Sequence, residues 1–188
     1  MEDELRKWLK GRVSAPRFQH SISVLETVAG LADRHGVDQA PLRMAALLHD
    51  CARELPNEEL VASAEELGLP VREVDRMSPV LLHGKVAAEI ASRELGITDA
   101  SIISAVLWHT AGHPEMSLSD KVFYLSDVME PTRQHDWVRE LRELAGVNVD
   151  RAVLMAIDIN ITHLDNTGRV VDPDTYALKA LLMQDLNG

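Results

Sequence analysis

A chain of 188 residues is long enough to bury the core of one domain, so we expect a single domain over residues 1–188 with its core between about 17 and 182. The net charge of −11, with no basic stripe to displace counterions, excludes a nucleic-acid backbone as the main partner. The single cysteine excludes an intramolecular disulfide, and no run approaches the roughly eighteen apolar residues of a membrane span. We therefore expect a cytoplasmic protein without a membrane partner.

Proline, glycine and capping residues divide the chain into about eight predicted helices. Pro16 stands near the start of the first long helix and Gly36 follows its end. The second helix ends before Pro56, and Ser117 with Asp120 forms the capping-box pattern of a later one. The predicted helices begin near residues 16, 38, 57, 78, 98, 117, 148 and 172. Aromatic residues make up only 4% of the chain, and Ala, Leu and Val dominate, so the predicted fold is all-α.

The pair His49-Asp50 interrupts an otherwise apolar segment between Leu42 and Ala52. Burying an imidazole and a carboxylate is costly unless something compensates, and a metal ion is a common compensation. Further metal-binding side chains follow in separate segments: His20, His83, His109 and Asp127. Because a helix or a turn separates these segments, tertiary packing must assemble the predicted metal site.

Histidines combined with aspartates suit Fe, Co, Mn or Zn better than Mg or Ca, which prefer oxygen ligands. One ion or two are compatible with this set, and two ions about 3.5–4 Å apart would clamp a phosphate during in-line displacement. The residues thus predict hydrolysis of a phosphoester or phosphoanhydride. Cations beside the ligand segments are candidates for phosphate contact: Arg53, Lys85 and Arg133. The remaining histidines are interpreted as surface or loop residues without a metal: His35, His113, His135 and His163.

The ordered series of histidines and aspartates resembles the HD-domain phosphohydrolase superfamily, an all-helical fold. A closer likeness, to its YqeK-type branch, extends over about residues 17–182. It is carried by Leu82-His83-Gly84, Trp108-His109-Thr110-Ala111-Gly112, the segments 116–121 and 124–133, and Asp172-Pro173-Asp174-Thr175. The long block from His109 to Arg133 is the most specific part of the resemblance.

The resemblance implies a symmetrical bis(5'-nucleosyl)-tetraphosphatase, which splits diadenosine tetraphosphate into two ADP and commonly binds iron. It implies a primary metal bound by His20, His49, Asp50 and Asp127, with His83 and His109 at the substrate phosphates or at a second metal. We assign catalysis to Asp50, His83, His109 and Arg53. Substrate contacts are assigned to His20, Arg53, His83, Lys85, His109, Asp127, Arg133, Thr175 and Tyr176, and the segment 170–176 is expected beside the nucleotide.

Two other functions stay open at this point. The same metal site would also suit a nucleoside monophosphate or triphosphate, and a non-catalytic nucleotide-binding module is a third reading. The six retained ligands favour an enzyme, because a degenerate site loses ligands. The apolar positions of the last helix are expected to pack on the core, and a homodimer through them is the alternative.

Overall fold

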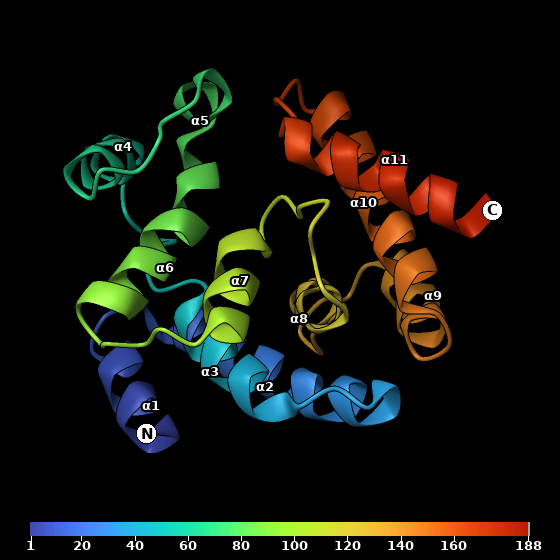
Figure 1. The fold of residues 1–188 in the computed structure, drawn as a ribbon, viewed down its shortest axis with the longest axis horizontal. Coiled ribbons are helices and arrows are strands. Elements are labelled where there is room, and N and C mark those ends of the chain that lie inside the picture. The colour runs from blue at the N-terminus through green and yellow to red at the C-terminus, as the bar shows by residue number, and fades with distance from the viewer. Residues whose placement is uncertain (188) are drawn as a thin grey trace.

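The structure, a computed structural model, describes residues 1–187. Within this range it has eleven α-helices, one short 3-10 helix and no strand, which confirms the all-α fold (Figure 1). The helices are α1 (Glu2–Lys10), α2 (Ala15–His35), α3 (Gln39–Leu48), α4 (Asn57–Glu66), α5 (Glu73–Met77), η1 (Pro79–Leu82), α6 (His83–Arg93), α7 (Ala100–Trp108), α8 (Leu118–Val128), α9 (Asp136–Ala145), α10 (Val149–Asn166) and α11 (Pro173–Asn187).

The predicted starts and stops agree with the structure where a capping residue marks them. Gly36 takes a left-handed conformation, with φ of 64°, directly after α2. The Ser117 hydroxyl accepts the Asp120 backbone N–H, and the Asp120 carboxylate accepts the Ser117 N–H at 2.8 Å, so the capping box at α8 is confirmed. Three short helices were not predicted: α1, α5 and α9.

The predicted second helix ends earlier than expected, and this changes the setting of the His-Asp pair. We expected the helix to continue almost to Pro56, but α3 stops at Leu48. The backbone then tightens into turns in which the N–H of Cys51 donates to the Leu48 carbonyl and that of Arg53 to the Asp50 carbonyl. Since these are bonds to the third residue back, the pair lies at the end of a helix rather than within it.

The helices pack around a core of aliphatic side chains. Helix α2 packs on α3 and α8, and α3 packs on α7. Helix α7 packs on α6, while α10 packs on α8, α9 and α11. Figure 1 shows α8 between these two groups, with α4 to α6 on one side and α9 to α11 on the other. This arrangement brings the C-terminal ends of α3, α7 and α8 toward the same region of the molecule.

The last helix buries only part of its apolar surface. Leu178 and Leu182 are fully buried, as core packing predicts, whereas Tyr176, Leu181 and Met183 are exposed.

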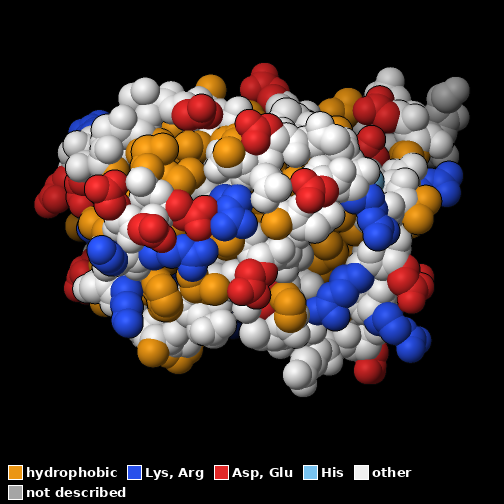
Figure 2. All heavy atoms as spheres, turned by 90° about the horizontal axis from the view of Figure 1, so that it is seen from below, with side chains coloured by type: hydrophobic (Ala, Val, Ile, Leu, Met, Phe, Trp, Pro, Cys, Tyr) orange, Lys and Arg blue, Asp and Glu red, His pale blue; other side chains and the backbone are white. Residues whose placement is uncertain are grey.

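On the face drawn in Figure 2, acidic and basic side chains are interspersed, with hydrophobic side chains between them. No helix among the described residues is long and apolar enough to cross a membrane.

Candidate metal centre and substrate cavity

Four histidines and two aspartates meet where helix ends converge. His20 belongs to α2, His49 and Asp50 follow α3, His83 opens α6, His109 follows α7 and Asp127 lies in the last turn of α8. His49 is fully buried, and His83, His109 and Asp50 are each at most 5% exposed. Tertiary packing thus brings together all six residues predicted to bind metal, and we call them the HD cluster.

Hydrogen bonds fix which nitrogen of each imidazole faces the HD cluster. The Nδ1 atoms of three histidines lie against the carbonyl three residues earlier: His49 against Ala46 at 2.9 Å, His109 against Val106 at 2.7 Å, and His83 against Val80. A carbonyl only accepts, so each Nδ1 carries the proton and each Nε2 has a free lone pair. For His20, the Nδ1 atom lies 3.4 Å from Oε1 of the buried Glu130, which leaves its Nε2 facing inward too.

One half of the HD cluster surrounds Oδ2 of Asp50 and Oδ1 of Asp127. The Nε2 atoms of His20 and His49 both lie 3.6 Å from Asp50 Oδ2. They lie 3.0 Å and 3.9 Å, respectively, from Asp127 Oδ1. Asp127 Oδ1 is buried without a hydrogen bond of acceptable geometry. Two anionic oxygens and two imidazole lone pairs in one buried space fit a divalent cation.

The other half surrounds the second oxygen of Asp50. Asp50 Oδ1 lies 3.2 Å from His83 Nε2 and 3.7 Å from His109 Nε2. Since Oδ2 faces His20 and His49, the Asp50 carboxylate stands between two pairs of imidazoles. The geometry therefore has donors for one ion or for two ions that share Asp50 as a bridging ligand.

The electrostatics of the HD cluster keep its acids ionised and a central imidazole neutral. Burial lowers the pKa of His49 to about 4, against the opposing effect of Asp50. Burial acts to raise the pKa of both aspartates, but the surrounding histidines outweigh it. The pKa of Asp50 falls well below its usual range, and that of Asp127 falls to about 2. Burial also acts to lower the pKa of His20 and His109, but Asp127 and Asp50 outweigh it and raise both values. Because a metal binds the ionised carboxylate and the neutral imidazole, a bound cation would compete with protons at these two histidines.

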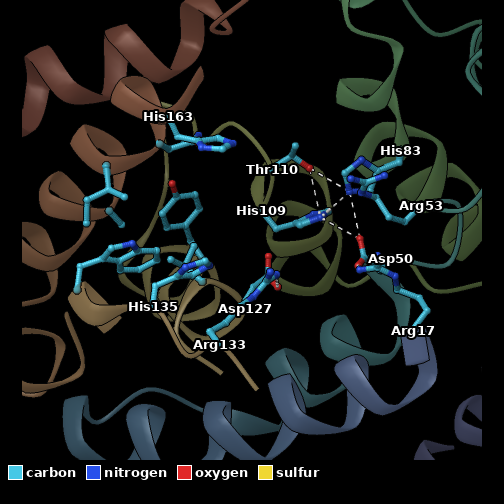
Figure 3. Close-up of a pocket in the computed structure, with 16 residues that line it drawn as sticks. Arg17, Asp50, Arg53, His83, His109, Thr110, Asp127, Arg133, His135 and His163 are labelled. Carbon is cyan, nitrogen blue, oxygen red and sulfur yellow. Dashed lines mark hydrogen bonds and ion pairs between the residues drawn. The ribbon is translucent and has the colours of Figure 1, made fainter. Parts of the chain in front are cut away.

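A cavity of about 540 Å³ opens beside the HD cluster (Figure 3). Its cluster side is formed by Asp50, His83, His109 and Asp127, flanked by Arg17, Arg53, Thr110, Val128 and Arg133. The remaining lining residues are Tyr124, His135, Trp137, Ala156, Ile159, Asn160 and His163. Figure 3 shows His135 and His163 across the cavity from His83 and Arg53. The three arginines place positive charge along a cavity that also contains the carboxylates of Asp50 and Asp127, an arrangement suited to an anionic substrate.

A second cavity of about 480 Å³ adjoins the first, and both are lined by Arg53, Thr110 and Asn160. The Thr110 hydroxyl lies 3.3 Å from His83 Nε2 and 3.2 Å from His109 Nε2. The HD cluster thus lines the first cavity and contacts, through Thr110, the junction of that cavity with the second. We call them the main cavity and the side cavity.

Three predicted substrate contacts lie elsewhere in the structure. Lys85 lines neither cavity, and its Nζ donates to both oxygens of the buried Asp75 carboxylate at 2.9 and 3.0 Å. Thr175 donates its hydroxyl to the Ala111 carbonyl at 2.8 Å and so anchors the start of α11. Tyr176 is 48% exposed on α11 and lines neither cavity. Of the segment expected beside the nucleotide, only Val170 borders a cavity.

Several residues of the site were missed by the sequence analysis. Arg17 donates to Asp50 Oδ2 at 2.5 Å, and Glu130 accepts the bond from His20. The position of Arg17 three residues before His20, close to one helical turn, is a signal for the first. His135 and His163 were expected on the surface or in loops, and both are exposed residues that border the main cavity without joining the HD cluster.

Comparison with known proteins places this site in a family. Residues 17–132 match the HD domain. The chain is 33% identical over 174 residues to the symmetrical bis(5'-nucleosyl)-tetraphosphatase of Bacillus subtilis, covering 93% of each protein. It is 32% identical to the protein of the same name from Halalkalibacterium halodurans, covering 90% of each.

A solved structure agrees over almost the whole chain. The crystal structure of a predicted HD superfamily hydrolase from Clostridium acetobutylicum superposes with a TM-score of 0.94 at 31% sequence identity, covering 98% of both chains. The HD match includes all five segments that supply the HD cluster, from His20 to Asp127. The chain therefore belongs to the HD-domain family, and its relatives along nearly its full length are named symmetrical bis(5'-nucleosyl)-tetraphosphatases.

Proposed function

We propose that this protein is a metal-dependent hydrolase that cleaves diadenosine tetraphosphate symmetrically into two ADP. The observation that carries the proposal is the HD cluster beside the junction of two cavities. A dinucleoside tetraphosphate cut at its centre has a nucleoside diphosphate arm on each side of the scissile bond. The two adjoining cavities offer room for both arms, and each lies within the usual range of ligand pockets, about 300–1,000 Å³. The names of the relatives support the same substrate.

The metal in this proposal is iron, with Co, Mn or Zn as alternatives. His20, His49, Asp50 and Asp127 would hold the primary ion, and His83 and His109 with the other oxygen of Asp50 would hold a second. An ion held in such a site acts as a Lewis acid and makes water nucleophilic near neutral pH. The mixed imidazole and carboxylate donors support this choice of metals over Mg or Ca.

The chain's own residues would bind and orient the phosphates. Arg53 and Arg133 line the main cavity, and no hydrogen bond or ion pair among residues 1–187 engages the Arg53 guanidinium. We assign phosphate binding to both arginines, and orientation of Asp50 to Arg17. A new bond forms between water oxygen and one of the two central phosphorus atoms. The bond from that phosphorus to the bridging oxygen breaks, and this oxygen leaves with the second ADP, which balances the hydrolysis.

Product analysis tests the proposal. Purified protein is incubated with diadenosine tetraphosphate, with and without added Fe, Co or Mn, and the nucleotides are separated by chromatography. We expect ADP as the sole product and loss of turnover on chelation or in an Asp50→Ala variant that stays helical. AMP together with ATP would contradict symmetrical cleavage. If a parallel panel shows turnover only of a nucleoside monophosphate or triphosphate, that nucleotide replaces diadenosine tetraphosphate as the assigned substrate. An absence of turnover with every metal would favour a non-catalytic nucleotide-binding module.

The proposal also covers the organisation of the protein. We propose one domain over residues 1–188 and a cytoplasmic location. A homodimer through the exposed apolar side chains of α11 stays a prediction. Light scattering measures it: a mass of 20.8 kDa would show a monomer, and twice that mass a dimer.

A further inference from the structure

The wall of the main cavity opposite the HD cluster has a chemistry of its own. It is built by Trp137 in the first turn of α9 and by Ala156, Ile159, Asn160 and His163 of α10. Figure 3 shows His163 of α10 across the cavity from His83. None of these five side chains is acidic or basic except for the His163 imidazole. A wall of this kind suits an uncharged, planar group better than it suits a phosphate.

Trp137 presents a flat aromatic surface whose orientation is held by a neighbour. The rings of His135 and Trp137 are stacked, with an angle of 9° between their planes and 5.3 Å between their centroids. His135 is exposed and Trp137 is partly buried, and both line the main cavity. An indole held flat at a cavity wall is a platform on which a nucleobase can stack, as in proteins that bind single-stranded nucleic acid.

Two polar side chains that line the same cavity as Trp137 have unused hydrogen-bonding groups that could contact the edge of a base. Among residues 1–187, no hydrogen bond engages the side-chain amide of Asn160 or the imidazole of His163. An amide offers both a donor and an acceptor, and this pair matches the N6 and N7 atoms of adenine. Tyr124 completes the wall, and burial raises the pKa of its phenol, which therefore stays neutral.

We propose that Trp137, Asn160 and His163 form a purine-binding subsite for one of the two nucleosides of the substrate. The proposal rests on the dinucleotide substrate of the proposed function. The base stacks on Trp137, and its edge faces Asn160, while the phosphates extend across the cavity toward Arg53 and the HD cluster. Because Asn160 and Arg53 also border the side cavity, the second arm of the substrate leaves in that direction.

Binding measurements on the metal-loaded protein test this subsite without relying on turnover. The probes are ADP and inorganic pyrophosphate, which share two phosphates but differ in the nucleoside. For Trp137→Ala we expect ADP to bind about tenfold more weakly or worse, the usual cost of removing an aromatic partner from a stacked base, and pyrophosphate to bind within about twofold of the wild type. Trp137→Phe should restore most of the ADP affinity. Trp8→Ala, on α1 and outside both cavities, should change neither probe.

Asn160→Ala provides a second, smaller substitution should Trp137→Ala unfold. It should reduce the preference for ADP over inosine diphosphate, which lacks the adenine amino group. Equal loss of ADP and pyrophosphate affinity, unchanged ADP affinity in both variants, or no ADP binding by the wild type would overturn the subsite. The proposed function is measured separately by cleavage of the dinucleotide, so either can fail alone. Wild-type ADP binding that depends on Trp137, without dinucleotide cleavage, would sustain the subsite and reject the reaction.

Discussion

The Nε2 atoms of His83 and His109 lie 2.9 Å apart in a buried site. Both Nδ1 atoms already donate to backbone carbonyls, so two lone pairs face each other unless a proton or a cation stands between them. Asp50 Oδ1 lies 3.2 Å and 3.7 Å from these same two nitrogens. A divalent cation bound by the two nitrogens and Asp50 Oδ1 would remove this repulsion, as would a proton on one of the two imidazoles.

Metal removal should therefore lower the thermal stability of the protein. An ion that binds only the folded state stabilises it by mass action, and we expect chelation to lower the Tm by about 5 °C or more. Scanning calorimetry before chelation, after it and after addition of metal measures the effect. His113→Ala, which alters a histidine stacked on Trp108 outside the HD cluster, should keep the full shift. A Tm that is indifferent to chelation would show that the folded chain has no tight ion.

Glu130 should act on metal binding through His20. Its buried carboxylate faces His20 Nδ1, and loss of such a partner commonly weakens metal affinity about 10- to 100-fold. We expect that range for Glu130→Ala, measured by competition with a metal indicator, and a smaller loss for Glu130→Gln, whose amide oxygen can still accept the bond. The matched control is Glu140→Gln, at an exposed position on α9. An unchanged metal affinity in Glu130→Ala would remove this residue from the site.

Arg53 and Lys85 should differ in what their loss affects, although both were predicted to contact phosphate. Arg53→Ala should raise the KM for the dinucleotide about tenfold or more, since charge-assisted bonds to phosphate are strong. Arg53→Lys should restore only part of the loss because it lacks the planar fork. Lys85→Ala should leave the KM unchanged and lower the Tm, since its partner Asp75 is fully buried. Steady-state kinetics measures the KM and calorimetry the Tm on the same preparations. A raised KM in Lys85→Ala together with an unchanged KM in Arg53→Ala would contradict the assignment.

Asp75 should make the stability of the protein depend on acid pH. Burial opposes its ionisation, but Arg72 and Lys85 together lower its pKa below the ordinary 3.8. The ionised form thus stabilises the fold above that ordinary value, and this contribution is lost as the pH falls through the lowered pKa. We expect Asp75→Asn to be less stable by about 2 kcal/mol at pH 7, with the difference shrinking below about pH 4. Urea unfolding from pH 3 to pH 7 measures it, and a difference that does not vary with pH would contradict the prediction.

The residues of the HD cluster were predictable from sequence because few roles other than metal binding explain several imidazoles and carboxylates inside an apolar core. An imidazole and a carboxylate among aliphatic residues require a partner, and the ordered series His20, His49, Asp50, His83 and His109 supplied enough of them to indicate a metal. The all-α class followed from capping residues and from the scarcity of aromatics. These signals lie in the local sequence or in the composition, so they can be recognised without knowledge of how the helices pack.

Long-range partners could not be predicted, because no local pattern marks them. Lys85, two residues after His83, was predicted to contact phosphate, and the structure pairs its Nζ with Asp75 of α5, a helix that was not predicted. Arg72 in turn binds Asp172 and Asp174 at the start of α11, a hundred residues later. Trp137 was overlooked because α9 is short and charged, and only packing against α10 places it at the main cavity.

The carbonyls that orient three of the four imidazoles have a consequence for mutational robustness. The acceptors belong to the main chain of Ala46, Val80 and Val106, so no replacement of those side chains deletes them. His20 differs, because its acceptor is the side chain of Glu130. Substitutions of Ala46, Val80 or Val106 therefore leave an acceptor for His49, His83 and His109 as long as the helices end where they do. In contrast, a single codon change at position 130 can remove the acceptor that orients His20.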